Sequence, residues 1–231
     1  MMKKILFLLT AFAFNTLISC SGDNKKINDS ADSTASKNST EKVVKTNKKY
    51  QLKSGIITMI SGTMGMTQTM TLYFDDYGNK ECAETMGEMD MGIVGKVHMP
   101  QQLLAITKDG YAYNIDMTNK SGTKTKIMPN RMQKDIDFSN LTEDMMKQMK
   151  ITKQGTEVLL GRTCDKYSMY EPALKMKSSY SVWNGIPLKS EVNIAGIVAK
   201  TITTKIEENC VIPAERFEIP KDIKITELKG M

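Results

Sequence analysis

The sequence is poor in the residues that most enzymes use for catalysis. Its 231 residues include one histidine (His98), one tryptophan and four cysteines, and no two cysteines form a Cys-x-x-Cys pair. Neither a Gly-x-Ser-x-Gly motif nor a glycine-rich phosphate loop occurs. Asp75 and Asp76 stand in a predicted turn and are interpreted as turn formers. We therefore predict that the protein is not an enzyme and has neither a catalytic metal nor a cofactor.

Positive charge is concentrated at the start of the chain. Of 32 basic and 26 acidic residues, eight lysines and four acidic residues lie up to Lys48, which leaves 24 basic against 22 acidic residues in the rest. Such a nearly equal number of basic and acidic residues does not provide the basic surface that nucleic-acid binding needs. We therefore expect no nucleic-acid partner.

The first residues carry an export signal whose apolar run is too short to span a membrane. Lys3 and Lys4 precede an apolar stretch over residues 5–14, about half of the roughly 20 residues that a spanning helix needs. Leu17-Ile18-Ser19-Cys20 resembles the lipobox at which bacterial lipoprotein signal peptidase cuts. That resemblance implies that residues 1–19 are a lipoprotein signal peptide and that Cys20 becomes the lipidated N-terminus, the contact with the membrane.

A polar segment separates this anchor from the remainder. Residues 21–48 contain no aromatic side chain and consist mainly of Ser, Thr, Asn, Asp and Lys, so they are predicted to be a disordered tether. As a flexible coil the tether spans on the order of 30 Å. Ser21 rather than Asp after Cys20 permits outer-membrane delivery under the enteric sorting rule. We expect an envelope protein, with the membrane face left open, and one β-rich domain over residues 49–231.

Methionine is the most distinctive component of that domain, since the chain contains 19. Over residues 56–99 apolar and polar side chains alternate, as in strands with one buried face, and residues 75–79 supply turn chemistry. Methionine is a poor strand former, but its flexible thioether adapts to irregular guests. We therefore predict a long hairpin whose methionine-rich face lines a cavity. That face is predicted to carry Ile60, Met64, Met66, Met70, Leu72 and Phe74, then Met89, Met91, Ile93, Val97 and Met99.

The rest of the domain is predicted to consist of short strands and one helix. Asn140-Leu141-Thr142-Glu143 resembles a capping box, and Leu141, Met145 and Met149 share one helical face. This helix is interpreted either as a structural cover or as a mobile gate over the methionine face. Strands are predicted at residues 50–57, 103–107, 111–117, 123–128, 157–160, 177–183, 188–194, 198–206 and 217–220.

Two segments, residues 72–81 and 181–191, share a layout. Each has an aromatic-ended strand, a polar turn with glycine, and a return strand that opens with Lys and then Glu. Consecutive hairpins of a curved antiparallel sheet produce such an echo without duplication.

Three cysteines remain after Cys20, namely Cys82, Cys164 and Cys210. An oxidising compartment allows one disulfide, for which Cys164 and Cys210 are the preferred pair. Three separate thiols are the alternative.

Taken together, these features resemble an uncharacterised lipoprotein family of the Gram-negative envelope. The resemblance covers residues 50–225 and rests on the lipobox, the tether, the hairpins, the Trp-x-Gly-x-Pro-Leu-Lys motif at residues 183–189 and the Phe-x-x-Pro motif at residues 217–220. That family is similar in architecture to the lipoprotein carrier LolA, its receptor LolB and the LppX group. LolA differs in being soluble, and the protruding hydrophobic loop of LolB has no counterpart here.

The resemblance implies an α+β, mostly β fold. The expected architecture is a curved antiparallel sheet that forms an incomplete (half) β-barrel covered by one or two short helices. Its cavity is expected to hold a lipid or acyl chains. The candidate lining residues are Met64, Met66, Met70, Leu72, Phe74, Met89, Met91, Ile93, Met145, Met149 and Trp183.

Two alternatives to a lipid carrier remain. Thioethers favour Cu(I), so the protein could instead handle copper. The ligand pool for copper is Met86, Met89, Met91, His98, Met99 and Cys82. The second alternative is a structural or assembly lipoprotein with no ligand, whose envelope partner is unknown.

Overall fold

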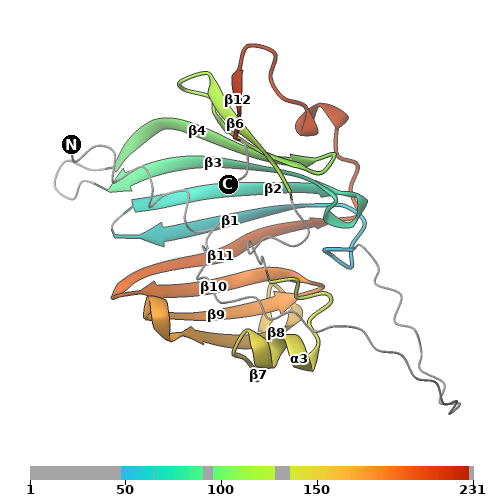
Figure 1. Cartoon of the computed structure of the whole chain (residues 1–231), viewed down its shortest axis with the longest axis vertical. Helices are drawn as coiled ribbons and strands as arrows, with labels where there is room; N and C mark the ends of the chain where they lie inside the picture. The colour runs from blue at the N-terminus through green and yellow to red at the C-terminus, as the bar shows by residue number, and fades with distance from the viewer. Residues whose placement is uncertain (1–47, 65, 91–95, 128–135, 229–231) are drawn as a thin grey trace, which may run out of the picture.

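The structure is a computed structural model that describes residues 48–64, 66–90, 96–127 and 136–228. The described strands form one twelve-stranded sheet in the order β12-β6-β5-β4-β3-β2-β1-β11-β10-β9-β8-β7 (Figure 1). The strands are β1 (Gly55–Thr63), β2 (Met66–Asp75), β3 (Lys80–Asp90), β4 (Lys96–Lys108), β5 (Tyr111–Asp116), β6 (Ser121–Lys126), β7 (Ile151–Leu159), β8 (Arg162–Glu171), β9 (Met176–Trp183), β10 (Ile186–Ile194), β11 (Ile197–Glu208) and β12 (Lys224–Leu228). Neighbouring strands are antiparallel except β12 and β6, which are parallel.

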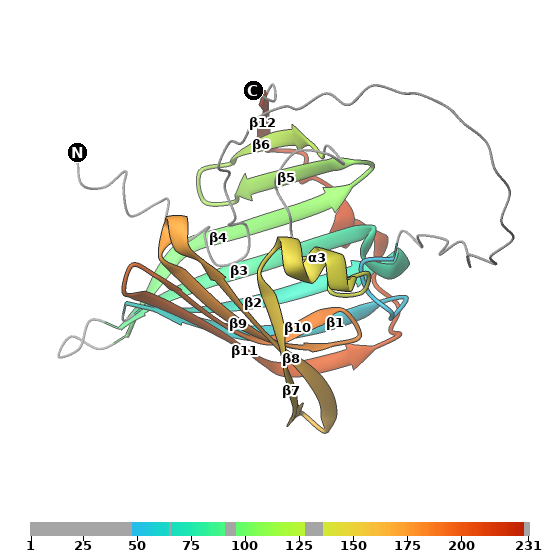
Figure 2. The ribbon, with the colours of Figure 1, turned by 60° about the horizontal axis from the view of Figure 1, so that its bottom comes forward.

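The sheet curls around a short helix without closing into a barrel. The helix is α3 (Glu143–Gln148), which lies on the concave face in Figure 2. The described residues also include the 3₁₀ turns η1 (Asp76–Gly78), η3 (Pro172–Leu174) and η4 (Ala214–Phe217). The outermost strands in the sheet order, β12 and β7, do not pair with each other in the described structure. This arrangement confirms the predicted fold class, a mostly β, incomplete barrel with a short helix.

Two meanders make up the sheet. Strands β1 to β6 follow one another in space, and so do β7 to β11, with β12 added beside β6. The two meanders are joined by one seam, at which β1 pairs with β11 from Gly55–Glu208 to Thr63–Ala199. The first strand of the domain therefore lies in the middle of the sheet, and the contacts that hold the halves together are among the longest in sequence.

The predicted first hairpin is divided differently in the structure. Residues 56–74 were expected to form one strand, but β1 ends at Thr63 and β2 begins at Met66, with Met64 in the left-handed region at φ 48°. In the β1–β2 hairpin, odd-numbered residues of β1 face even-numbered residues of β2, as in the pair Met59–Met70. Ile60 and Met64 are therefore not on the face of Met70, and that part of the prediction is wrong.

Three further expectations need correction. Residues 50–54 precede β1 and lie outside the sheet. The N-cap of α3 is Thr142, whose hydroxyl accepts from the Met145 amide, whereas the Asn140 amide group donates to Asp137. The Phe-x-x-Pro segment is not a strand, because Phe217 ends η4 and the closing strand β12 begins later. Thr142 is the N-cap because its extended backbone directs the short hydroxyl toward the amides of the first helical turn.

Buried side chains form three clusters. The central cluster comprises Tyr50, Ile57, Met59, Met70, Leu72, Phe74, Cys164, Ile186 and Leu188. The helix cluster comprises Ile151, Met169 and Met176, with Ile136, Leu141, Met146, Met149, Tyr167, Val192 and Ile194 packed against it. The convex cluster, on the other face of β3 to β5, comprises Cys82, Leu104, Ile106, Tyr113, Ile115 and Phe217. Phe217 and the neighbouring Ile212, Ile219 and Ile223 show that the C-terminal segment covers this second face.

Residues 48–54, which we call the strap, tie the two meanders together at one end of the sheet. The Tyr50 amide donates to the Tyr77 carbonyl in the turn between β2 and β3, and the Gln51 amide donates to the Asn184 carbonyl in the turn between β9 and β10, each at 3.0 Å. The Tyr50 hydroxyl donates to the buried Glu81 carboxylate at 2.6 Å. The two turns with similar sequence layouts are thus both hydrogen-bonded to the strap.

The charge of Glu81 is compensated within the strap. The Lys49 ammonium lies 2.7 Å from one carboxylate oxygen of Glu81, and the Tyr50 hydroxyl bonds to the other. Burial and the nearby carboxylate raise the pKa of Tyr50, so its hydroxyl stays protonated and keeps donating. A buried carboxylate with two partners avoids the penalty of an unpaired charge.

The echoing turns need glycine because the strap packs directly on them. Gly78 has φ +86°, and a Cβ there would lie 2.8 Å from the Tyr50 ring. Gly185 has φ +81°, and a Cβ there would overlap the Ser139 hydroxyl and lie 2.8 Å from the Lys49 carbonyl oxygen. The glycine of the Trp-x-Gly-x-Pro-Leu-Lys motif is therefore a packing requirement of the closed end.

Replacing Gly185 should reveal how tightly this end is packed. Gly185→Ala adds strain of about 1–2 kcal/mol for the left-handed backbone and about 1–3 kcal/mol for overpacking. The control Gly110→Ala has φ +76° with no atom within 4 Å of the new Cβ, so only the backbone strain applies. Urea denaturation should show a larger loss of unfolding free energy for Gly185→Ala, and equal losses would contradict close packing of the strap.

Candidate ligand-binding face

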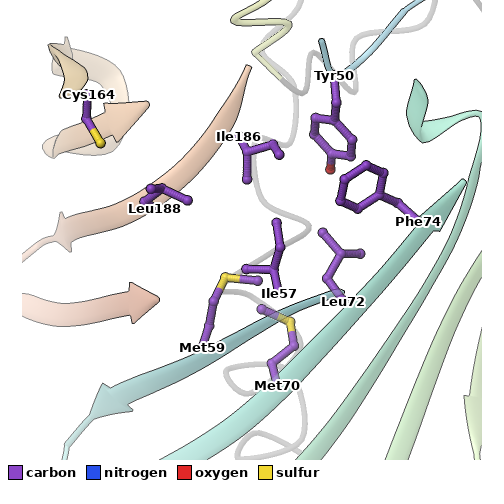
Figure 3. Packing of buried hydrophobic residues seen from close by; sticks show 9 residues of the cluster. All are labelled: Tyr50, Ile57, Met59, Met70, Leu72, Phe74, Cys164, Ile186 and Leu188. Carbon is purple, nitrogen blue, oxygen red and sulfur yellow. The ribbon is translucent and has the colours of Figure 1, made fainter. Parts of the chain in front are cut away.

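The concave face is most apolar where the first hairpin meets the second meander. Met59 and Met70 are direct cross-strand partners, as are Ile57 and Leu72, so these four side chains project from one face of the sheet. All four are at most 7% exposed. Figure 3 shows them gathered together, with Leu188 approaching from β10. Both meanders therefore contribute to one apolar surface.

A second group of methionines lies beneath α3. Met169 of β8 pairs with Ile151 of β7, and both pack with Met176 in the helix cluster. From the helix, Met146 and Met149 pack against this group. The helix thus covers the concave face of the second meander with the same flexible side chain that lines the first.

The predicted lining residues divide into several groups. Met70, Leu72 and Phe74 lie together in the central cluster, and Met66 is half-buried on the same face of β2. Met64 is 69% exposed at the turn after β1 and does not join them. The Met89 backbone pairs with Met66. Two candidates fall outside the described residues, namely Met91 and Ile93.

The remaining candidates lie near the second meander. Trp183 is half-buried, packs against the central cluster and has the Arg162 guanidinium 4.9 Å from its ring centroid. Met149 packs in the helix cluster, whereas Met145 is half-buried and Met146 takes the place expected for it. The helix begins two residues later than a cap at Asn140 implies.

Several concave-face residues were not singled out from the sequence. Met59, Ile186 and Leu188 are each 1% exposed and belong to the central cluster. Met59 was missed because the run over residues 56–74 was treated as one strand of constant parity. In a hairpin with a two-residue turn, the inward-facing positions change from odd numbers in the first strand to even numbers in the second. Applying that rule would have put Met59 on the same face as Met70.

The described members of the copper ligand pool come from two neighbouring strands, β3 and β4. Cys82 belongs to the convex cluster, and burial raises the pKa of its thiol to about 11. Met86 pairs with Thr69 and Met89 with Met66, positions that lie on opposite faces of β2. His98 and Met99 belong to β4. Among the described residues, no three His, Cys, Asp or Glu side chains are grouped as metal ligands.

The three described cysteines are free thiols. Cys82 and Cys164 are buried in different clusters, and Cys210 is half-buried after β11. The pair Cys164–Cys210, preferred from the sequence, is therefore not joined in this structure. Burial raises the pKa of Cys164 as well as that of Cys82.

Comparisons with known proteins support the fold. No family model and no curated protein matches the chain. An uncharacterized conserved protein from Thermus thermophilus is similar, with a TM-score of 0.51 at 9% identity over 77% of this chain and 92% of that one. At this identity the likeness shows the fold alone.

The architectural group named from the sequence is represented among the solved structures. Lipoprotein LppX from Mycobacterium tuberculosis aligns with a TM-score of 0.36 at 9% identity, over 70% of this chain and 90% of that one. A domain described for outer membrane lipoprotein sorting in Vibrio parahaemolyticus aligns with a TM-score of 0.31 at 10% identity, over 71% and 88%. These scores carry no argument about function. Within the described residues, no helix has the length and apolar character needed to cross a bilayer.

The thiols should differ in reactivity in a defined order. At pH 8 a thiol with a pKa of about 11 is deprotonated in only about one molecule in a thousand, and burial shields it further. We expect iodoacetamide to modify Cys210 first and Cys82 much more slowly, as measured by peptide mass spectrometry of the native protein. Cys210→Ser should remove the fast phase. Fast labelling of Cys82 would instead reopen it as a soft-metal ligand.

Proposed function

We propose that this protein is a membrane-anchored envelope lipoprotein whose concave face binds or carries a lipophilic ligand, a lipid or its acyl chains. The observation that carries the proposal is the gathering of Met59, Met70 and Leu188, with their neighbours, on one face from two meanders. A surface of this kind offers thioether and aliphatic contacts to a long apolar chain. It lies inside a sheet that stays open.

The choice of methionine supports a face that accommodates a guest. Strand interiors that only need filling favour β-branched and aromatic side chains. Here thioethers recur on the concave side, and an unbranched thioether can repack around irregular shapes. The side chains concerned are Met59, Met66, Met70, Met146, Met149, Met169 and Met176.

The position of the domain follows from the sequence features that precede it. A lipidated Cys20 and a polar tether would hold the domain at a root-mean-square distance of roughly 30 Å from a bilayer. Delivery to the outer membrane is part of the proposal and rests on the lipobox and Ser21. A cell-envelope location places the concave face beside a source of acyl chains.

Stiffening the methionine face should weaken uptake without unfolding the protein. Met59→Leu combined with Met70→Leu conserves volume, so each change should cost under about 1.5 kcal/mol. We expect affinity for a fluorescent fatty acid, titrated into the chain from residue 21 onward, to fall about threefold or more. The matched control replaces two exposed methionines outside this face, Met64→Leu with Met86→Leu. Equal affinities in all three proteins would count against the proposal.

A second measurement identifies the natural occupant. Native mass spectrometry of the protein extracted from its own envelope should reveal a co-purifying lipid mass. Bound copper would favour a metal-handling protein, and a protein that is empty and takes up no fluorescent fatty acid would favour a structural role.

A further inference from the structure

Hydroxyl side chains form a continuous row across the concave face. Ser61 of β1 pairs with Thr201 of β11, which pairs with Ser190 of β10, then Tyr180 of β9, then Tyr167 of β8. Direct cross-strand partners in an antiparallel sheet project to the same side. We call these five residues the hydroxyl row. Its strands are neighbours at about 4.8 Å spacing, so the row extends over roughly 19 Å.

The hydroxyl row runs between the two apolar clusters. On one side, Met59 lies two residues before Ser61 on the same face of β1 and belongs to the central cluster. On the other side, Met169 lies two residues after Tyr167 on β8 and belongs to the helix cluster. The Phe138 ring lies 5.3 Å from the rings of both Tyr167 and Tyr180, so the tyrosine end is covered from the side of α3.

Two buried hydroxyls beside the row have no hydrogen-bond partner among the described residues. They are Thr203 Oγ1 and Ser178 Oγ, and each residue is 5% exposed. Ser61 and Thr201 within the row satisfy each other at 3.0 Å, whereas these flanking hydroxyls do not. Leaving a buried hydroxyl unpaired is unfavourable, and such groups in folded proteins call for an explanation.

The backbone is shaped to turn one of these hydroxyls inward. A bulge at the seam makes Met59 pair with Thr203 although Thr58 pairs with Lys205, so Thr204 is an extra residue. Thr204 then donates to the Thr58 carbonyl while Thr203 is buried opposite Met59. Bulges re-aim side chains and are frequent beside functional sites.

The surroundings of the row are uncharged except at its Tyr167 end. No member of the row, nor Thr203 or Ser178, is ionic. At the Tyr167 end, Lys153 is the register partner of Tyr167 and forms an ion pair with Asp165 at 2.9 Å. Burial and the hydrogen-bonded Asp165 carboxylate raise the pKa of Tyr167, so this phenol already has a partner.

Burial raises the pKa of Tyr180, so the phenol remains a neutral donor. The Ser178 hydroxyl lies near enough to that phenol to lower the pKa in part, which leaves Thr203 as the clearer of the two unpaired hydroxyls. Away from the Tyr167 end, neutral donors with no cation beside them suit a carbonyl oxygen better than a carboxylate or a phosphate.

We propose that the hydroxyl row, with Thr203 and Ser178 beside it, is a polar subsite for the ester or amide carbonyl of an uncharged acyl ligand. The proposal rests on the function proposed above, since the two apolar clusters would hold the hydrocarbon on either side. A hydroxyl aimed into this face donates to the carbonyl and thereby becomes satisfied. The ligand class is thus narrowed from any apolar chain to acyl esters and amides.

The test compares an ester with a hydrocarbon of similar length. Diphenylhexatriene, an oxygen-free fluorescent probe, first measures binding to the apolar face of the chain from residue 21 onward. Methyl oleate and 1-octadecene then compete for it. Thr203 and Ser178 lie two strands apart and on opposite sides of the row, so the single carbonyl of methyl oleate can reach only one of them. We expect one of Thr203→Val and Ser178→Ala to weaken methyl oleate roughly three- to tenfold, as for one lost neutral hydrogen bond, and both to leave 1-octadecene unchanged. The thermal midpoint of the ligand-free variants should stay level or rise, because an unpaired hydroxyl is removed.

The control variant is Thr69→Val, an exposed threonine on the opposite face of β2, which should change neither competitor. Unchanged competition by methyl oleate in both Thr203→Val and Ser178→Ala would overturn the subsite while leaving the proposed function standing. Equal weakening of the ester and the hydrocarbon would also overturn it, since that marks general damage to the face. Failure of the unaltered protein to bind the probe would overturn the proposed function and this inference with it.

Discussion

The pairing of β1 with β11 is the constraint on which the concave face depends. Among the described strands, the two meanders share no other pair, and the central cluster takes Met59 and Met70 from one and Leu188 from the other. The hydroxyl row crosses the same seam between Ser61 and Thr201. Because these partners lie 140 residues apart in sequence, the seam closes a large loop, and its formation should limit the folding rate.

The strap gives the open sheet one closed end. Its backbone amides bond to the two echoing turns, and its side chains supply both partners of the buried Glu81 carboxylate. The segment that follows the predicted tether is therefore a structural part of the domain. The predicted tether and the folded domain therefore meet at Lys48 and Lys49, at the end of the sheet that the strap closes.

Much of the fold could be predicted from alternation, turn residues and one capping motif, because each is a local property. Strands β5, β9, β10 and β11 lie where the sequence placed them, within about two residues at either end. The candidate site was harder to predict, because the face that a strand residue occupies depends on whether its position is odd or even, and a turn or bulge changes that count. A turn at Met64 carries no strong turn residue before Gly65, so Met59 was overlooked and Met64 was included. The hydroxyl row could not be predicted, since its members come together only through strand register.

A sheet that does not close into a barrel has two edge strands, and both edge strands here are protected against pairing with another chain. The edge strand β7 exposes residues 152–156, with Lys153 on the surface and a bulge ending at Gly155, while β12 is five residues long with Lys224 and Glu227 exposed. Charge, irregularity and shortness discourage another chain from adding itself as a further strand. That protection opposes the growth of fibres from an open sheet, even where many copies are held close together.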